Sequence, residues 1–243
     1  MIHVGHVREV ARYPIKSMAG VATDSAMLGW HGLVGDRRFA FRRIGGANGF
    51  PWLTASKLPE LVCYQPDGCD ESTGEPLPTH VRTPTGSRLE LRSAKLISEI
   101  SERLHSAVEL MQLKHGIFDE APVSVITRAT IRGIGREAGI ETDLDHRRFR
   151  ANILIETEND EPFLEDDWVG RTLVFGESDA ASPIVHVTMP DLRCVMINLD
   201  PDTAAKDARI MKTVARLNQN NAGAYATVVR PGVISVGNRV SLV

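Results

Sequence analysis

Cys194 is the residue in this sequence with the clearest capacity for chemistry, because Arg193 directly precedes it and a proline-centred turn at residues 200–203 follows closely. A guanidinium beside a thiol favours the thiolate, since a nearby positive charge stabilises the ionised form. A thiolate can attack an electrophile or bind a soft metal. Most free cysteines, in contrast, behave as small buried hydrophobes. The local sequence leaves three interpretations of Cys194 open: a structural thiol, a nucleophile and a metal ligand.

Polar residues that would suit an anionic ligand lie beside the boundaries of expected elements, where binding residues tend to collect: Lys16, Ser17, Arg37, Arg150, Asn152, Arg193 and Tyr225. An arginine can bind a phosphate through two parallel hydrogen bonds, and a lysine supplies a point charge. Three such arginines and a lysine around one cavity would suit a phosphorylated cofactor. Most arginines and lysines are solvated surface charges, so each of these residues also has an ordinary interpretation.

The composition is that of a globular protein of 243 residues, with 42% hydrophobic and 24% charged residues and a formal net charge of −3. This balance gives no global electrostatic reason for nucleic-acid binding. No apolar run approaches the roughly 18 to 20 residues that span a bilayer, and residues 1–10 are interrupted by charged and histidine side chains, unlike a secretory signal. We therefore expect a cytoplasmic protein without a membrane span and without a nucleic-acid partner.

The remaining cysteines, Cys63 and Cys69, are separated by five residues, a spacing that matches neither zinc nor iron–sulfur motifs. Three cysteines in a chain of this size favour reduced thiols, and we interpret these two as structural. The eight histidines form no H-x-x-x-H pair, so the sequence predicts no zinc site.

The elements that must position these residues begin with a run of short strands over the first ninety residues. Charged and apolar residues alternate over 36–42, as in a half-buried strand, and residues 61–64 and 80–83 repeat the pattern. Tyr13-Pro14 ends the first strand, because proline cannot donate to a strand ladder. Short strands joined by glycine and proline turns favour a barrel or a sandwich.

The first helix is expected over residues 94–106, where Ser93 can cap it and the apolar residues recur every three or four positions. The sequence then predicts helices over 128–137 and 204–217, strands over 123–126, 149–156, 171–175, 184–189, 195–199 and 224–229, and a closing hairpin at Gly237-Asn238. The predicted fold class is therefore mainly β with a few helices.

Four ordered segments together resemble the MOSC family: residues 13–17, residues 35–39, residues 148–153, and Arg193-Cys194 with residues 200–203. More narrowly, they resemble the branch that contains the mitochondrial amidoxime-reducing component and its bacterial relatives. The resemblance covers nearly the whole chain and implies an N-terminal β-barrel region packed with a MOSC β-barrel domain. We expect the first over residues 1–93, and the linking helix with the MOSC domain over residues 94–243.

The resemblance also implies a molybdenum cofactor (molybdopterin with molybdenum), with a protein cysteine ligating the metal beside the pterin dithiolene, and it implies no link to pyridoxal phosphate. Carried over residue by residue, Cys194 is the implied molybdenum ligand and catalytic residue. The implied cofactor-binding positions are Lys16, Ser17, Arg37, Glu120, Ala121, Arg150, Asn152, Arg193 and Tyr225. Ala121 has no side-chain donor, so only its backbone could serve. Whether Asp200 and Asp202 act chemically or only shape their turn stays open.

The implied activity is the reduction of small N-hydroxylated or N-oxygenated compounds, in which the cofactor performs the difficult step and the protein orients it. Some bacterial relatives carry a ferredoxin domain with clustered cysteines, which this sequence does not contain. Electrons are therefore expected from a separate ferredoxin- or cytochrome-type protein. The alternative hypothesis is a cofactor carrier or sulfur-delivery protein without turnover of its own. A β-barrel interaction domain, in which Cys194 is incidental, is the third.

Overall fold

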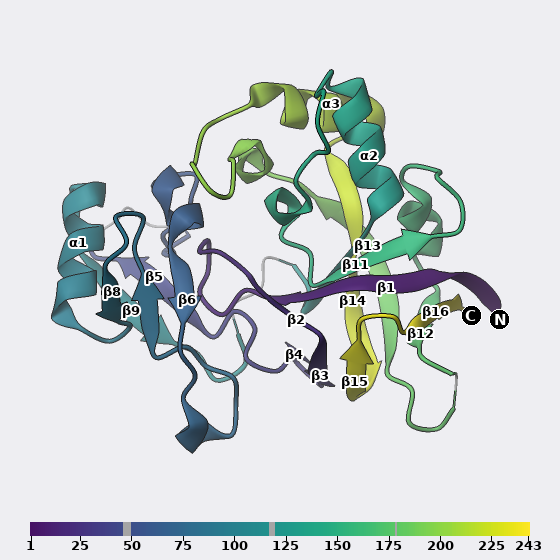
Figure 1. Ribbon diagram of the computed structural model, residues 1–243, viewed down its shortest axis with the longest axis horizontal. Helices are drawn as coiled ribbons and strands as arrows, with labels where there is room; N and C mark the ends of the chain where they lie inside the picture. The colour runs from purple at the N-terminus through teal and green to yellow at the C-terminus, as the bar shows by residue number, and fades with distance from the viewer. Residues whose placement is uncertain (46–49, 117–119, 178) are drawn as a thin grey trace.

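A closed barrel of seven strands forms the centre of the computed structural model, which describes residues 1–45, 50–116, 120–177 and 179–243 (Figure 1). The barrel strands are β1 (Ile2–Arg12), β10 (Val123–Thr127), β11 (Ile153–Thr157), β12 (Thr172–Phe175), β13 (Ile184–Leu192), β14 (Asn221–Arg230) and β16 (Arg239–Leu242). The ring runs β1-β11-β10-β14-β13-β12-β16 and returns to β1. Its neighbours are antiparallel except for β10 and β11. A ring of this kind leaves no open sheet edge among its members.

Strand β1 closes the ring because it pairs with β11 along one edge and with β16 along the other. Its register shifts between Val7 and Glu9 against β11, and between His3 and Gly5 against β16. Such bulges bend a strand and increase its twist, which a barrel wall requires. Gly5 is needed there, since a Cβ atom would lie 2.1 Å from the carbonyl oxygen of Glu156. Beyond the barrel, the end of β1 also pairs with β2 (Val21–Thr23).

Two helices cover one side of the barrel, α2 (Arg128–Glu137) and α3 (Ala208–Asn218), as Figure 1 shows above the strands. Helix α2 belongs to the crossover that parallel strands β10 and β11 require. Thr127 caps it, accepting a hydrogen bond from the Thr130 amide at 3.1 Å. Ile134 of α2 and Val214 of α3 are fully buried in a shared apolar cluster. The crossover also contains η3 (His146–Phe149), a short 3-10 helix that contributes Arg148 and Phe149 to a cavity wall.

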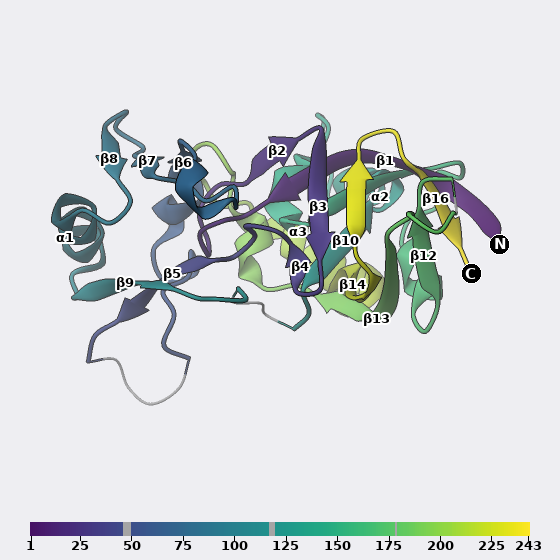
Figure 2. The same cartoon turned by 90° about the horizontal axis from the view of Figure 1, so that it is seen from below.

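A smaller lobe lies to one side of the barrel in both views (Figures 1 and 2). It consists of β5 (Phe39–Arg43) paired with β9 (Val108–Gln112), of the sheet β6 (Gln65–Asp67), β7 (His80–Arg82) and β8 (Arg88–Glu90), and of α1 (Ala94–Leu104). Phe39, Phe41 and Tyr64 are buried in its own apolar core. A separate three-stranded sheet, β15 (Gly232–Ser235), β3 (Ser25–Gly29) and β4 (Gly32–Leu33), packs its buried residues into the barrel core.

The predicted fold class is confirmed, since the described residues form mostly strands with three α-helices. The helix expected over residues 94–106 is α1, and the Ser93 hydroxyl accepts from the Leu96 amide at 3.3 Å. The helix expected over 128–137 is α2, and the one expected over 204–217 begins later, as α3 at Ala208. No described helix is both long and apolar enough to cross a membrane. The division of the chain between residues 93 and 94 stays a prediction.

The strand expected over 149–156 begins only at Ile153, as β11, and three other local predictions were wrong. Residues 61–64 lie mostly in η1 (Pro59–Cys63), a 3-10 helix that begins with a proline, a residue favoured at helix starts. Residues 195–199 form η5 (Val195–Asn198), also a 3-10 helix, because a four-residue apolar run does not distinguish a strand from a helical turn. The turn at Gly237 forms, but β15 pairs with β3 while β16 pairs with β1 and β12, so the two strands make no hairpin.

Candidate functional site

A cavity of about 230 Å³ surrounds Cys194 where the barrel meets the smaller lobe. Its walls come from the segment after β1, the segment before β5, η3, the end of β13, and β14. It brings together eight of the ten residues that the sequence singled out: Lys16, Ser17, Arg37, Glu120, Arg150, Arg193, Cys194 and Tyr225. Ala121 and Asn152 are buried and do not line it. Residues from Lys16 to Tyr225 therefore line one cavity together with Cys194.

Cys194 lies just beyond the end of β13 and precedes the first residue of η5. The residue is exposed and forms no disulfide. Packing therefore does not explain this cysteine, whereas a buried hydrophobe would have been enclosed in a core. Leu192 and Val195, on either side of it, are also exposed. The thiol is thus accessible from the cavity and flanked by apolar side chains.

The Arg193 guanidinium forms part of the cavity wall. It donates to the carbonyl oxygens of Ala222 at 2.6 Å and Phe149 at 2.5 Å, and it pairs with Asp191 at 2.8 Å. Its side chain is only 8% exposed. Gly223 makes room for it, because a Cβ atom there would lie 2.9 Å from Nη2 of Arg193 and the backbone φ is +86°. Arg193 therefore joins β13, β14 and η3 around the site.

Asp191 is a buried acid in the same wall that the sequence analysis did not single out. Its carboxylate accepts a hydrogen bond from the Ser124 hydroxyl at 2.7 Å and pairs with Arg193. Burial raises the pKa of Asp191 above its ordinary value, while Arg193, Ser124 and Tyr225 favour the ionised form. Because Ser124, Asp191 and Tyr225 lie on three neighbouring strands, this group fixes the barrel side of the cavity.

Asn152 does not line the cavity but is hydrogen-bonded to residues that do. Its Nδ2 donates to Ala11 O at 3.2 Å and to an oxygen of Asp36 at 3.1 Å, and its Oδ1 accepts from the Ser124 amide at 3.1 Å. The same oxygen accepts from Nη1 of Arg37 at 3.2 Å, and Arg37 also pairs with Asp36. The structure therefore places Asn152 as a link between the barrel and Arg37 rather than as a wall of the cavity.

Three lining residues have backbone angles in the left-handed region: Ser17 at φ +67°, Arg37 at +46° and Arg150 at +53°. This conformation is uncommon for residues other than glycine and costs roughly 1–2 kcal/mol. It persists only where surrounding contacts impose it, which is frequent at functional sites. Arg150 shows such contacts, since it donates to Met18 O at 2.5 Å and lies 4.3 Å from the centre of the Tyr13 ring.

Arg148 is the lining cation that the sequence analysis missed, although it opens one of the four family-like segments. Its Nη1 donates to Asn198 O at 3.1 Å and its Nη2 to Asp200 at 2.9 Å. Its Nε is buried and has no hydrogen-bond partner among the described residues. Arg148 also borders a second cavity of about 260 Å³ that shares Arg150 and Met196 with the first.

The match to known protein families follows the two halves of the chain. The family model of the MOSC N-terminal beta barrel domain matches residues 4–117, and the family model of the MOSC domain matches residues 112–241. The chain belongs to the MOSC family. The Cys194 cavity draws on both matched regions of this MOSC protein, with Lys16 and Arg37 from the first and Arg150 and Cys194 from the second.

The MOSC chain is similar to curated proteins named molybdenum cofactor sulfurase. It is 23% identical to that of Drosophila mojavensis over 248 residues, covering 86% of this chain and 30% of the relative. It is 27% identical to that of Drosophila pseudoobscura pseudoobscura over 164 residues, covering 67% of this chain and 19% of the relative. The chain thus spans less than a third of these relatives. Among solved structures, the YuaD protein of Bacillus subtilis shares the fold, with a TM-score of 0.53, 13% identity, and coverage of 98% of this chain and 95% of that one.

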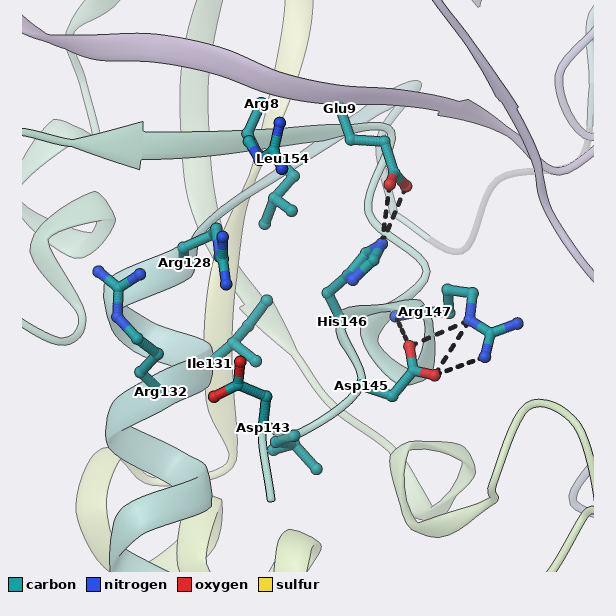
Figure 3. A pocket seen from close by; sticks show the side chains of 11 residues that line it. Arg8, Glu9, Arg128, Ile131, Arg132, Asp143, Asp145, His146, Arg147 and Leu154 are labelled. Carbon is teal, nitrogen blue, oxygen red and sulfur yellow. Dashed lines mark hydrogen bonds and ion pairs between the residues drawn. The ribbon is translucent and has the colours of Figure 1, made fainter.

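A larger cavity of the MOSC protein, about 480 Å³, lies between β1, β11, α2 and residues 143–147 and has different chemistry. Figure 3 shows Arg128 and Arg132 on one wall and His146 directed at Glu9. Its lining residues form ion pairs, for example Arg132 with Asp160 at 2.6 Å, as Arg193 and Asp191 do in the Cys194 cavity. It contains no thiol and shares no lining residue with the Cys194 cavity. Of these two cavities, only the smaller one therefore contains a thiol.

Proposed function

We propose that this MOSC protein binds a molybdenum cofactor at Cys194 and reduces small N-hydroxylated compounds with electrons from a separate ferredoxin- or cytochrome-type protein. The observation that carries the proposal is the exposed Cys194 thiol in a cavity with an excess of positive charge. Among the described residues, five cationic side chains line that cavity, Lys16, Arg37, Arg148, Arg150 and Arg193, against two acidic ones, Glu120 and Asp191. A thiol and clustered guanidinium groups are what a sulfur-bound metal and a phosphate require together.

The donor set fits such a group. A thiolate is a soft ligand, suited to a metal already bound by sulfur. Within the described part of the chain, no cluster of three or more histidine, cysteine or acidic side chains could hold a metal ion, so Cys194 would act as a single protein ligand. The buried Nε of Arg148, which lacks a hydrogen-bond partner among the described residues, is the kind of donor that a phosphate oxygen satisfies.

Each residue then has a defined task. Cys194 would hold the metal, and Lys16, Arg37 and Arg150 would bind the phosphate and the polar edge of the pterin. Arg193 and Asp191 keep the wall in place through their mutual ion pair. When bound, the cofactor supplies the two-electron chemistry that removes oxygen from the nitrogen of the substrate. Exposed Leu192 and Val195 offer apolar contacts to a substrate beside the thiol.

The second candidate function is cofactor handling without turnover, either carriage or sulfur delivery. It is favoured by the similarity to proteins named molybdenum cofactor sulfurase. The two functions require the same cofactor site and differ in reduction of substrate. A cofactor-loaded protein that reduces no N-hydroxylated compound with any artificial electron donor would support the second.

The test is expression in a host that makes the cofactor, followed by measurement of bound molybdenum and of benzamidoxime reduction with a chemical donor. Cys194→Ser is compared with Cys69→Ser, because Cys69 is also exposed but does not line the cavity. We expect the parent protein and Cys69→Ser to hold molybdenum and to reduce the substrate. Cys194→Ser is expected to lose both. Metal-free parent protein, or equal reduction by the two variants, would contradict the proposal.

A further inference from the structure

Arg148 occupies the boundary between the Cys194 cavity and the neighbouring cavity of about 260 Å³. Its side chain is only 11% exposed, yet its buried Nε has no hydrogen-bond partner among the described residues. Leaving a buried donor unsatisfied costs roughly 1–3 kcal/mol, and more when the group is charged. Native structures rarely retain such a group without a ligand or ordered water. The position of Arg148 between two cavities therefore points to an acceptor that arrives from outside the chain.

The rest of the Arg148 guanidinium is held in place by the chain segment that follows η5. Nη1 donates to Asn198 O at 3.1 Å, and Nη2 donates to Oδ2 of Asp200 at 2.9 Å. The other oxygen of Asp200, Oδ1, closes the turn, accepting from the amides of Asp202 at 3.1 Å and Thr203 at 3.0 Å. The two carboxylate oxygens therefore do different work: one shapes the turn and the other orients the arginine.

Asp200 is well suited to this work because it stays ionised. Burial opposes ionisation, but the hydrogen bonds of the turn and the charge of Arg148 outweigh it and hold the pKa of Asp200 below its ordinary value. With two of its terminal nitrogens fixed by Asn198 and Asp200, Arg148 loses little further freedom when it binds an acceptor.

We propose that Arg148 binds an oxyanion, specifically a phosphate group of the ligand, at the junction of the two cavities, and that Asp200 is its positioning residue. Arg150 borders the same two cavities and supplies a second cation there. A phosphate between two guanidinium groups is the arrangement that arginine favours. The assignment of this phosphate to a cofactor rests on the proposed function, whereas the anion site itself does not.

A single-atom change separates the two tasks of Asp200. In Asp200→Asn, the amide oxygen can still accept the turn hydrogen bonds, but an NH2 group replaces the acceptor of Arg148. Asp160→Asn is the matched control, because Asp160 also pairs with an arginine, Arg132, at 2.6 Å, and neither residue lines the Cys194 cavity or the neighbouring cavity. Arg148→Gln and Arg148→Lys test the arginine directly.

The measurement is calorimetric titration of cofactor-free protein with inorganic phosphate at constant ionic strength. Melting temperatures of every variant establish that each is folded. We expect Arg148→Gln to bind phosphate about 10- to 100-fold more weakly, since a charge-assisted hydrogen bond is lost. We expect Asp200→Asn to bind about 3- to 30-fold more weakly on the same scale. Arg148→Lys is expected to fall between the parent and Arg148→Gln, and Asp160→Asn is expected to match the parent.

Three outcomes would overturn the inference: no phosphate binding by the parent, parent-like binding by folded Arg148→Gln, or equal binding by Asp200→Asn and Asp160→Asn. The last would leave Asp200 with a structural task alone. Because this titration requires no molybdenum and no turnover, it can succeed for a protein that proves to hold no metal. Failure of the anion site and failure of the proposed reductase are therefore distinguishable.

Discussion

Replacing Asn152 with alanine should destabilise the fold rather than only weaken a ligand site. Asn152 is 1% exposed. Its side-chain amide makes hydrogen bonds to four residues, Ala11, Asp36, Ser124 and Arg37. The Ser124 amide and the Ala11 carbonyl would each lose this partner, and an unsatisfied buried group costs roughly 1–3 kcal/mol. We expect a loss of about 3 kcal/mol in the free energy of unfolding, because water can reach only part of the space left.

The assay is urea denaturation, followed by fluorescence or circular dichroism, together with the melting temperature. For a chain of this size, a loss of about 3 kcal/mol lowers the melting temperature by roughly 6–12 °C. Asn159→Ala is the control, because Asn159 is exposed and its side chain makes no hydrogen bond to a described residue. It should stay within about 0.5 kcal/mol of the parent. Unchanged stability of Asn152→Ala, combined with loss of cofactor, would refute the structural assignment and make Asn152 a ligand contact.

Three further outcomes are expected. Burial raises the pKa of Glu165 above 4.5, so the folded chain holds that proton more tightly, and the free energy of unfolding falls as pH rises from about 4.5 through the folded pKa. Glu165→Gln should lack this fall in urea titrations between pH 4.5 and 8. Parallel curves for the variant and the parent would contradict this expectation. Thr127→Ala removes the α2 cap and should cost about 1–2 kcal/mol by the same method. Ser17→Gly relaxes a left-handed backbone, so its melting temperature should not fall. It also removes a side chain that lines the Cys194 cavity, so its content of bound pterin should fall.

The convergence of Lys16, Arg37, Arg150 and Cys194 on one cavity could be expected from the sequence because each belongs to a family-like segment. The partners of these residues could not. Asp191 is hydrogen-bonded to Ser124, 67 positions away, and Arg148 to Asp200, 52 positions away. A sequence pattern reports local periodicity and turn chemistry, whereas these contacts depend on which strands become neighbours.

Local sequence patterns also predicted only some of the secondary-structure elements. The apolar periodicity of α1 extends over about three turns and identifies that helix. The four residues of η5 offer no such length, and their helical turn depends on the burial of Ile197 against α3. The turn at Gly237 was correctly placed, but turn chemistry does not determine whether its two flanking strands pair with each other.

The pairing of β1 with β16 also has a kinetic consequence. Ile2 lies opposite Leu242, so the last seam of the ring joins residues that are almost the whole described chain apart. Contacts of such sequence separation are slow to form, because the intervening chain must first be ordered. During synthesis β1 can pair with β2 and β11 first, but its residues 2–6 lack their partner on the other edge until β16 emerges from the ribosome. A circular permutant that joins the two ends and opens the chain within residues 70–76 should retain every barrel pairing and close this seam early.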